Sequence, residues 1–290
     1  MIGFGLFSLT VSCELINPIE EVPAYLEVEK FSFSTSVEQG ANSEKISDAW
    51  VFIDEVSLGI YELPATIPNL NLGNRKVTIF PVVRENALPQ TPIIYPFYER
   101  YELLTDLVSG QVYPIKPVTG YLSSNTVFEL VEDFEGSNHR LNGGDPNAVR
   151  LINDPDKVRT GNGSGQVLLE SMEQVTFTSS ASFLDLPTEG GLPVFLELDY
   201  KTNISFEIGL VGIDVNPALP VNATNFKIIL CPVDFWNKVY INFQEDLTIS
   251  QLPAYKLAFR VSKDNQGCSI SENIVPEVLI DNVKFIRFQN

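Results

Sequence analysis

The sequence has 290 residues, which is enough for about two domains of roughly 150 residues each and for a substantial buried core. Hydrophobic residues make up 44% of the chain and charged residues 19%, a balance that excludes an intrinsically disordered polymer. Because 37 acidic residues oppose 19 basic ones, the formal net charge is −18, which disfavours broad binding to nucleic acids.

The first residues predict an export signal rather than part of a fold. Residues 1–12 form an apolar run that ends in small residues, and it is much shorter than the about 20 apolar residues of a membrane-spanning helix. The segment Thr10–Cys13 is similar to a bacterial lipobox, which implies a signal peptide over 1–12 and a lipid anchor on Cys13. The acidic residues 13–21 would then form a lipid-anchored linker. The alternative is a hydrophobic N-terminal strand with an ordinary cysteine.

Residues 22–121 predict a series of short β-strands without a convincing helical stripe. The segment Tyr25–Phe33 alternates apolar and polar side chains, which is typical of a half-buried strand. About seven strands in a hundred residues predict an immunoglobulin-like β-sandwich. The other predicted strands are Ala49–Asp54, Val56–Leu63, Arg75–Val83, Pro96–Glu102 and Gln111–Lys116.

The same region resembles a family of uncharacterised Bacteroidota lipoproteins. The resemblance rests on the motifs DAWVFID at 48–54, GIYELPA at 59–65 and YPFY at 95–98, in this order. It implies an outer-membrane location with a lipid anchor, and it implies no particular biochemical activity.

A second module is predicted over 127–290, after a junction at 121–127. A Phe-Glu pair within 127–136 and an Ile-Asp-Asn-Val strand within 277–286 resemble carbohydrate-binding modules with a jelly-roll, galactose-binding-like fold. The resemblance implies an all-β chain whose C-terminal half is a jelly-roll β-sandwich. Strands are predicted at 165–171, 194–201, 204–213, 226–230, 238–243 and 254–261.

Cys231 and Cys268 both lie beside strand-like sequence. An exported chain meets an oxidising compartment, so one disulfide between them is possible. Two unpaired buried thiols are the alternative, because the sequence does not fix the distance between the two Cα atoms.

The sequence offers little for catalysis. His139 is the only histidine, so neither a His-dependent triad nor a multi-histidine metal site is expected. The acidic residues Glu132, Asp133 and Glu135 would be candidates for the paired carboxylates of a glycosidase. In so acidic a chain, a solvated cluster is the better interpretation, and we expect no enzyme.

The resemblance to jelly-roll modules implies a structural calcium ion. In such modules the ion commonly ties the Phe-Glu segment to the final Asp-bearing strand, and the matching residues are Glu135 and Asp281. Backbone carbonyl groups of 161–165 would complete the about six to eight oxygen ligands that Ca²⁺ prefers. The alternative is that both carboxylates are ordinary residues at strand ends.

The segment 234–240 combines aromatic and polar side chains, which is the composition of a sugar-binding surface. Alternation along a strand places Trp236, Lys238 and Tyr240 on one face, opposite Val239. This face is predicted either as a stacking platform for a ligand or, for Trp236, as part of the sandwich core, and the core is the stronger expectation. Trp50 lies in an unbroken apolar run and is expected in the core.

Two classes of function follow. The main prediction is a non-catalytic outer-membrane lipoprotein that serves as an interaction or scaffolding subunit of a cell-envelope protein complex. The alternative is a glycan-binding surface lipoprotein of a polysaccharide-capture system, which rests on fold analogy alone. The first predicts aromatic side chains in cores or at a flat interface, and the second predicts two or three coplanar exposed rings in a groove.

Overall fold

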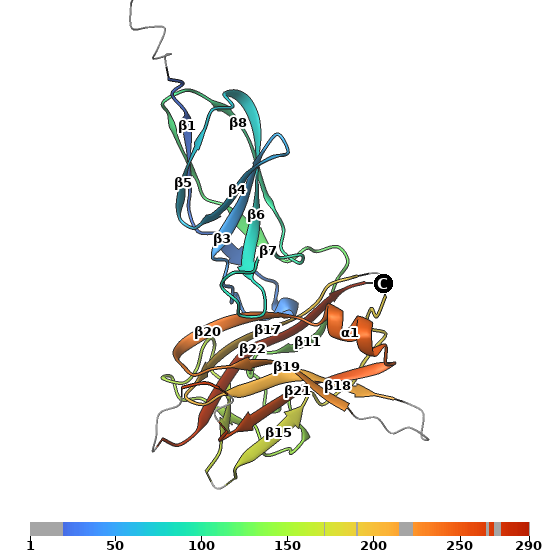
Figure 1. The fold of residues 1–290 in the computed structure, drawn as a ribbon. Coiled ribbons are helices and arrows are strands. Elements are labelled where there is room, and N and C mark those ends of the chain that lie inside the picture. Colours follow the sequence, from blue (N-terminus) through green and yellow to red (C-terminus); the bar gives the residue numbers. More distant parts are fainter. Residues whose placement is uncertain are drawn as a thin grey trace, which may run out of the picture.

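The computed structural model describes residues 20–170, 172–189, 191–214, 223–264, 267–269 and 274–289. Within these ranges the chain forms two all-β units, a smaller N-terminal unit stacked on a larger C-terminal one (Figure 1). The predicted signal peptide and Cys13 lie outside the described residues, and of the predicted linker only Glu20 and Glu21 are described. The described ranges contain no helix with the length and hydrophobicity that crossing a bilayer requires.

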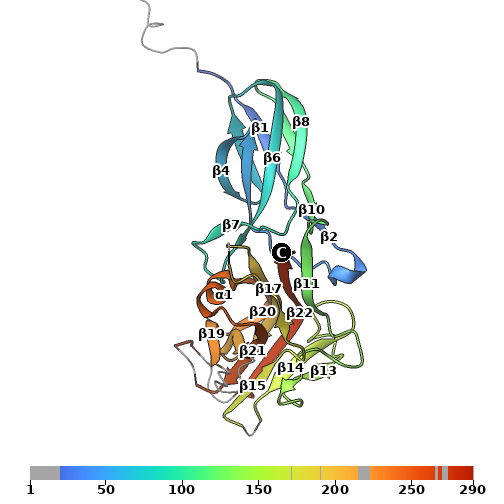
Figure 2. The ribbon, with the colours of Figure 1, turned by 90° about the vertical axis from the view of Figure 1, so that its right-hand side faces the viewer.

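The N-terminal unit is built from short strands in three sheets. Its strands are β1 (Ala24–Val28), β2 (Ser32–Ser34), β3 (Asp48–Ile53), β4 (Val56–Glu62), β5 (Ala65–Asn69), β6 (Gly73–Arg84), β7 (Pro92–Ile94), β8 (Tyr101–Leu107), β9 (Val112–Ile115) and β10 (Val118–Gly120). A five-stranded sheet has the order β4-β3-β6-β7, with β8 also paired to β6. A three-stranded sheet has the order β5-β1-β9, and a parallel pair of β10 and β2 leads toward the C-terminal unit (Figure 2).

Two predicted strands of this unit have other bounds in the structure, and β5, β7 and β10 were not predicted. The predicted strand Tyr25–Phe33 splits into β1 and β2, because the chain stops pairing with β9 and pairs next with β10. The predicted strand Pro96–Glu102 begins only at Tyr101, since residues 96–97 form a turn at the boundary between the units.

The C-terminal unit is a sandwich of two sheets. Its elements are β11 (Thr126–Glu132), β12 (Gly143–Gly144), β13 (Arg150–Ile152), β14 (Ser164–Leu168), β15 (Gln174–Thr178), β16 (Phe183–Leu184), β17 (Val194–Thr202), β18 (Phe206–Ile213), β19 (Ala223–Leu230), β20 (Val233–Asn242), α1 (Gln244–Ser250), β21 (Ala254–Ser262) and β22 (Glu277–Phe288). The interface sheet, which faces the N-terminal unit, has the order β13-β14-β22-β17-β20, with β11 paired to β22. The far sheet has the order β12-β15-β21-β18-β19, with β16 paired to β21.

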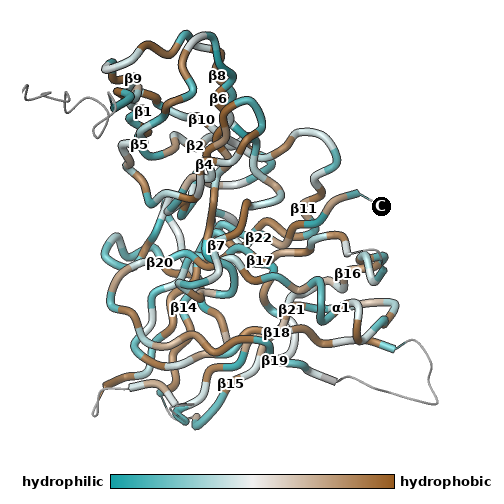
Figure 3. The backbone as a smooth tube through the Cα atoms, turned by 45° about the horizontal axis from the view of Figure 1, so that its top comes forward, coloured by the Kyte–Doolittle hydropathy of each residue, from teal (hydrophilic) through white to brown (hydrophobic). Residues whose placement is uncertain are grey.

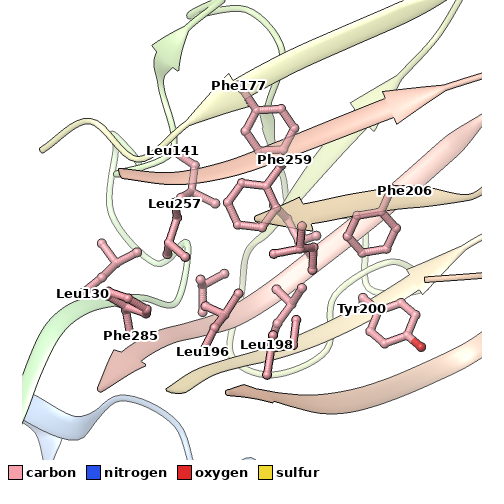
Figure 4. Packing of buried hydrophobic residues seen from close by; sticks show 14 of the residues in the cluster. Leu130, Leu141, Phe177, Leu196, Leu198, Tyr200, Phe206, Leu257, Phe259 and Phe285 are labelled. Carbon is pink, nitrogen blue, oxygen red and sulfur yellow. The ribbon is translucent and has the colours of Figure 1, made fainter. Parts of the chain in front are cut away.

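The sandwich core lies between these two sheets. Leu196 and Leu198 of the interface sheet are fully buried against Phe206 and Phe259 of the far sheet (Figure 4). The rings of Phe177 and Phe259 stack with centroids 5.0 Å apart. Each large apolar side chain buried in this way contributes about 1.5–3 kcal/mol. The hydropathy of the backbone shows the strands that supply the two cores. Apolar stretches run along β6 in the N-terminal unit and along β18 in the C-terminal unit (Figure 3).

The outer face of the interface sheet is buried as well. Along β17 the core-facing side chains alternate with Phe195, Glu197 and Asp199, all of which are at most 1% exposed. In a sandwich whose outer faces meet water, such positions are polar and solvated. Here they are covered because the N-terminal unit packs on them.

Cys231 and Cys268 form a disulfide, with their Cα atoms 5.4 Å apart. We expect Cys231→Ser to lower the free energy of unfolding by about 3–4 kcal/mol, because the bridge closes a loop of 37 residues in the unfolded chain. Urea unfolding measures this loss, and reductant should reproduce it in the parent while leaving the variant unchanged. A variant that unfolds at the midpoint of the oxidised parent would contradict this prediction.

Candidate functional site

The contact between the two units is an aromatic cluster. Tyr95 contacts Phe195 and Tyr240 of the interface sheet, with ring centroids 5.3 and 4.8 Å apart. Phe97 packs on Phe288 at 4.6 Å, and Tyr121 packs on Phe128 at 4.9 Å. One continuous hydrophobic cluster therefore contains the core of the N-terminal unit and part of the interface sheet.

Charged side chains lie buried at the centre of this contact. Lys238 Nζ lies 3.0 Å from Glu197 Oε2 and 3.9 Å from Asp199 Oδ2. The hydroxyl groups of Tyr95 and Tyr121 donate to the two oxygens of Glu197 at 2.8 and 2.9 Å. Burial opposes the charge on Lys238, but the two carboxylates outweigh it and raise its pKa.

The loop between β2 and β3 closes over these charges. Lys284 Nζ donates to the carbonyl oxygen of Ala41 at 2.9 Å, and Ser43 Oγ donates to Asp199 Oδ2. Burial lowers the pKa of Lys284 to about 8. The backbone N–H of Lys45 donates to the Tyr240 hydroxyl at 2.9 Å. Both units therefore contribute hydrogen bonds to one buried polar network.

These contacts correct the predicted stacking face. Lys238 and Tyr240 do share a face opposite Val239, as alternation indicated, but they are only 4% and 1% exposed. The N-terminal unit packs on that face, so the Tyr240 ring is not exposed as a stacking platform. Trp236 is half-buried on β20, and its Nε1 makes no hydrogen bond.

The two predicted calcium ligands bind the same loop through hydrogen bonds. Glu135 accepts from the backbone N–H groups of Asn162 and Gly163 at 2.6 and 3.1 Å and from the Asn162 side chain at 2.9 Å. These donors hold the pKa of Glu135 below its usual range. Gly161 has a φ of +67°, and a Cβ there would lie 2.1 Å from Glu135 Oε1, so only glycine allows this approach.

Asp281 is fully buried and accepts from the Thr160 backbone N–H at 3.2 Å, the Ser164 hydroxyl at 3.1 Å and the Asn282 backbone N–H at 2.7 Å. Burial is the main cause that raises its pKa to about 7. Both carboxylates thus face N–H and O–H donors, which do not fit a bound cation. Across the described residues, no cluster of three or more His, Cys, Asp or Glu side chains is arranged to hold a metal ion.

Glu132 and His139, the remaining polar candidates, form hydrogen bonds with backbone groups. Glu132 accepts from the N–H groups of Phe134 and Arg140 at 2.7 and 2.6 Å, so backbone groups hold its carboxylate in place. His139 Nε2 lies 3.1 Å from the carbonyl oxygen of Val149, and its Nδ1 accepts from the Leu141 N–H at 3.2 Å. Both ring nitrogens therefore have structural partners.

A ligand-sized hollow lies where the N-terminal unit no longer covers the interface sheet. It has a volume of about 640 Å³, and the side chain of Phe235 at its wall is 62% exposed. The disulfide at Cys231 fixes the chain just before β20 begins at Val233. The hollow is lined by Lys201, Thr202, Asn203, Pro232, Val233, Asp234, Phe235, Ser269, Glu277 and Leu279.

Polar side chains around this hollow are held in place. Asn203 Oδ1 accepts from the Glu277 N–H at 2.7 Å, and Thr202 Oγ1 donates to the carbonyl oxygen of Ile204 at 2.6 Å. Glu277 Oε1 accepts from Lys157 Nζ at 2.5 Å. Sequence reasoning missed Phe235, although its position just after Cys231 and Pro232 at the start of a strand was a usable signal.

No family model matches the sequence, and no curated protein matches it. Solved structures are similar over slightly more than half of the chain. A xylan-binding domain of carbohydrate-binding module family 22 is 13% identical, with 56% of this chain and 96% of that domain covered and a TM-score of 0.38. A family 30 module of a Clostridium thermocellum cellulosomal cellulase is 13% identical, with 57% and 94% covered and a TM-score of 0.35.

The enzymatically active domain of tailspike protein 4 from bacteriophage CBA120 is also similar, with 16% identity and a TM-score of 0.34. The match covers 56% of this chain and 19% of that domain, so the chain spans about a fifth of its length. These similarities are distant. They describe a β-sandwich over part of the chain, and they assign no ligand to it.

Proposed function

We propose that the protein is a non-catalytic glycan-binding lipoprotein of the cell surface, and that its C-terminal sandwich holds sugar in the hollow beside Phe235. The observation that carries this proposal is an aromatic side chain, 62% exposed, at the wall of a hollow of about 640 Å³. Ligand sites typically measure about 300–1,000 Å³ and combine apolar faces with a few fixed polar groups.

The chemistry of the hollow suits a sugar. The ring of Phe235 offers an apolar face for the C–H groups of a pyranose, and burial of that face is favourable. Asn203, Asp234 and Lys201 supply side chains that bond hydroxyl groups. Glycan binding is thus favoured over the scaffolding role that was the main sequence prediction, and that role stays a prediction.

The finer fold and the location belong to the same proposal. We assign the N-terminal unit to the immunoglobulin-like sandwiches, which its packed sheets of short strands support. We assign the C-terminal unit to the jelly-roll, galactose-binding-like sandwiches. The lipobox-like segment Thr10–Cys13 supports a lipid anchor in the outer membrane, and the proposed context is a polysaccharide-capture system.

We expect Phe235→Ala to weaken binding to neutral polysaccharide at least about tenfold, which corresponds to about 1.4 kcal/mol. Affinity electrophoresis in gels that contain arabinoxylan, galactomannan or mixed-linkage β-glucan measures the change. Ile249→Ala is the matched control, because this apolar side chain is 77% exposed on α1, away from the hollow. The proposal fails if the parent is not retarded by any of the three polymers, or if Phe235→Ala migrates as the parent does.

A further inference from the structure

The outer face of the five-stranded sheet carries aromatic side chains that the core does not use. Along β3, the side chains of Ala49 and Val51 are fully buried, whereas Trp50 and Phe52 point outward and are half-buried. Trp50 lies directly opposite Phe80 of β6. This position corrects the expectation that Trp50 lies in the core. The solvent face of an antiparallel sheet is normally polar, so rings there call for a role.

The three rings form a platform with a wall. The rings of Trp50 and Phe52 are neighbours, with centroids 5.6 Å apart and planes tilted by 30° to each other. Phe80 stands edge-on to Phe52, with centroids 5.5 Å apart and an angle of 75°. The indole N–H of Trp50 donates to Ser57 Oγ at 2.7 Å, which fixes the orientation of its ring.

Charged side chains border the platform, where one carboxylate pairs with two cations. Glu102 Oε1 lies 2.9 Å from Lys76 Nζ and 2.7 Å from Arg100 Nε. The guanidinium carbon of Arg100 lies 5.8 Å from the ring centroid of Phe80. All three charged side chains are 37–55% exposed, and ion pairs at such sites add little stability. They do hold hydrogen-bonding groups beside the rings.

The surface here is concave. A hollow of about 250 Å³ is bounded by Phe52, Phe80 and the three charged residues, among others. A neighbouring hollow of about 550 Å³ shares Phe80, Ile94, Arg100 and Glu102 with it. Together they fall within the usual size range of small-ligand sites, about 300–1,000 Å³.

We propose that Trp50, Phe52 and Phe80 form a second carbohydrate-binding site, on the N-terminal unit, that takes a neutral glycan chain. The neighbouring rings of Trp50 and Phe52 offer apolar faces for pyranose C–H groups, and Lys76, Arg100 and Glu102 offer donors and acceptors for hydroxyl groups. The chain has a net charge of −18, which repels acidic polysaccharides and selects neutral ones.

This second site shares no residue with the hollow beside Phe235, so the proposal for it does not depend on that hollow. Because one hydrophobic cluster joins the two units, the two sites keep a fixed spacing. A polymer long enough to occupy both would bind with avidity, since the second contact becomes intramolecular. An oligosaccharide too short to reach both sites would bind without this increase in affinity.

The test uses Trp50 as its own reporter. The chain has only two tryptophans, so Trp236→Phe leaves Trp50 as the single one. This variant of the full chain is titrated with arabinoxylan, galactomannan or mixed-linkage β-glucan, and with polygalacturonate as an acidic polymer. We expect a saturable shift of Trp50 emission with at least one neutral polymer and none with polygalacturonate.

Phe52→Leu in the same background keeps an apolar side chain but removes the stacking ring, and it should weaken the titration at least about tenfold. Its melting temperature, measured alongside, should match that of the background. Phe235→Ala in the same background is the control that should leave the Trp50 response in place.

Three results would overturn the second site. They are an unchanged Trp50 spectrum while the polymer is retained, an unchanged affinity in Phe52→Leu, and capture of a protein at this face without any glycan response. If retention depends on Phe235 alone, the second site fails and the first stands. If the Trp50 response persists while Phe235→Ala costs no affinity, the first site fails and the second stands.

Discussion

Lys238→Met is expected to lower the free energy of unfolding by about 3–5 kcal/mol. Lys238 is 4% exposed, and its ammonium group lies between Glu197 and Asp199, which are both fully buried. Removing the cation leaves the buried Glu197 without its ion pair, and Asp199 then pairs only with Arg159, whose Nε lies 3.7 Å from Asp199 Oδ1. Urea unfolding followed by circular dichroism measures the loss.

Lys263→Met is the matched control for this prediction. Lys263 also pairs with a carboxylate, Glu173 at 3.1 Å, but the side chain of Glu173 is 84% exposed. Surface pairs of this kind contribute about 0–1 kcal/mol, so the control should unfold close to the parent. If Lys238→Met costs no more than Lys263→Met, the buried ion pair between β17 and β20 does not stabilise the fold.

The second large effect is a dependence of stability on pH through Asp281. Burial raises the pKa of this carboxyl group from 3.8 to about 7 in the folded protein, and the neighbouring Asp199 acts in the same direction. The folded state therefore retains a proton that the unfolded state releases. The stabilisation is complete below about pH 4 and is lost as the pH rises through 7. Each unit of difference in pKa corresponds to about 1.4 kcal/mol, so the loss is on the order of 4 kcal/mol by pH 8.

Asp281→Asn removes the titrating group and should flatten the decline of stability between pH 4 and pH 8. Protonation of Lys284 changes the stability of the protein over a different pH range. Its folded pKa of about 8 lies below the usual 10.5, so its contribution is present above pH 10.5 and is lost as the pH falls through 8. Urea midpoints at pH 5 and pH 8 distinguish the two groups. If the urea midpoint falls by the same amount between pH 5 and pH 8 in the parent and in Asp281→Asn, Asp281 does not cause the loss of stability.

Alternation of apolar and polar residues predicted most strands because it follows directly from strand geometry. Along β20 it correctly set Lys238 and Tyr240 opposite Val239. It could not show that this face is covered, because the cover comes from residues about 140 positions earlier in the chain, among them Tyr95 and Tyr98.

The same limit explains the position of Trp50. An unbroken apolar run does not show which alternate side chains face inward, so Trp50 was assigned to the core beside Val51. Its outward position depends on β6, which places Phe80 and Thr78 opposite the aromatic side chains of β3. The hollow beside Phe235 has a similar origin, since Lys201, Asp234 and Glu277 come together from three different strands.

The position of β22 sets the order in which the protein can fold. This strand pairs with β11, β14 and β17, and it follows every other strand of the sandwich in the sequence. Pairings over such long stretches of chain form slowly, whereas the strands of the N-terminal unit lie within about a hundred residues of one another. The N-terminal unit can therefore form first, while the sandwich waits for its central strand. Because β22 also carries Lys284 and Ile286 into the contact, the step that closes the sandwich is the same step that joins the two units.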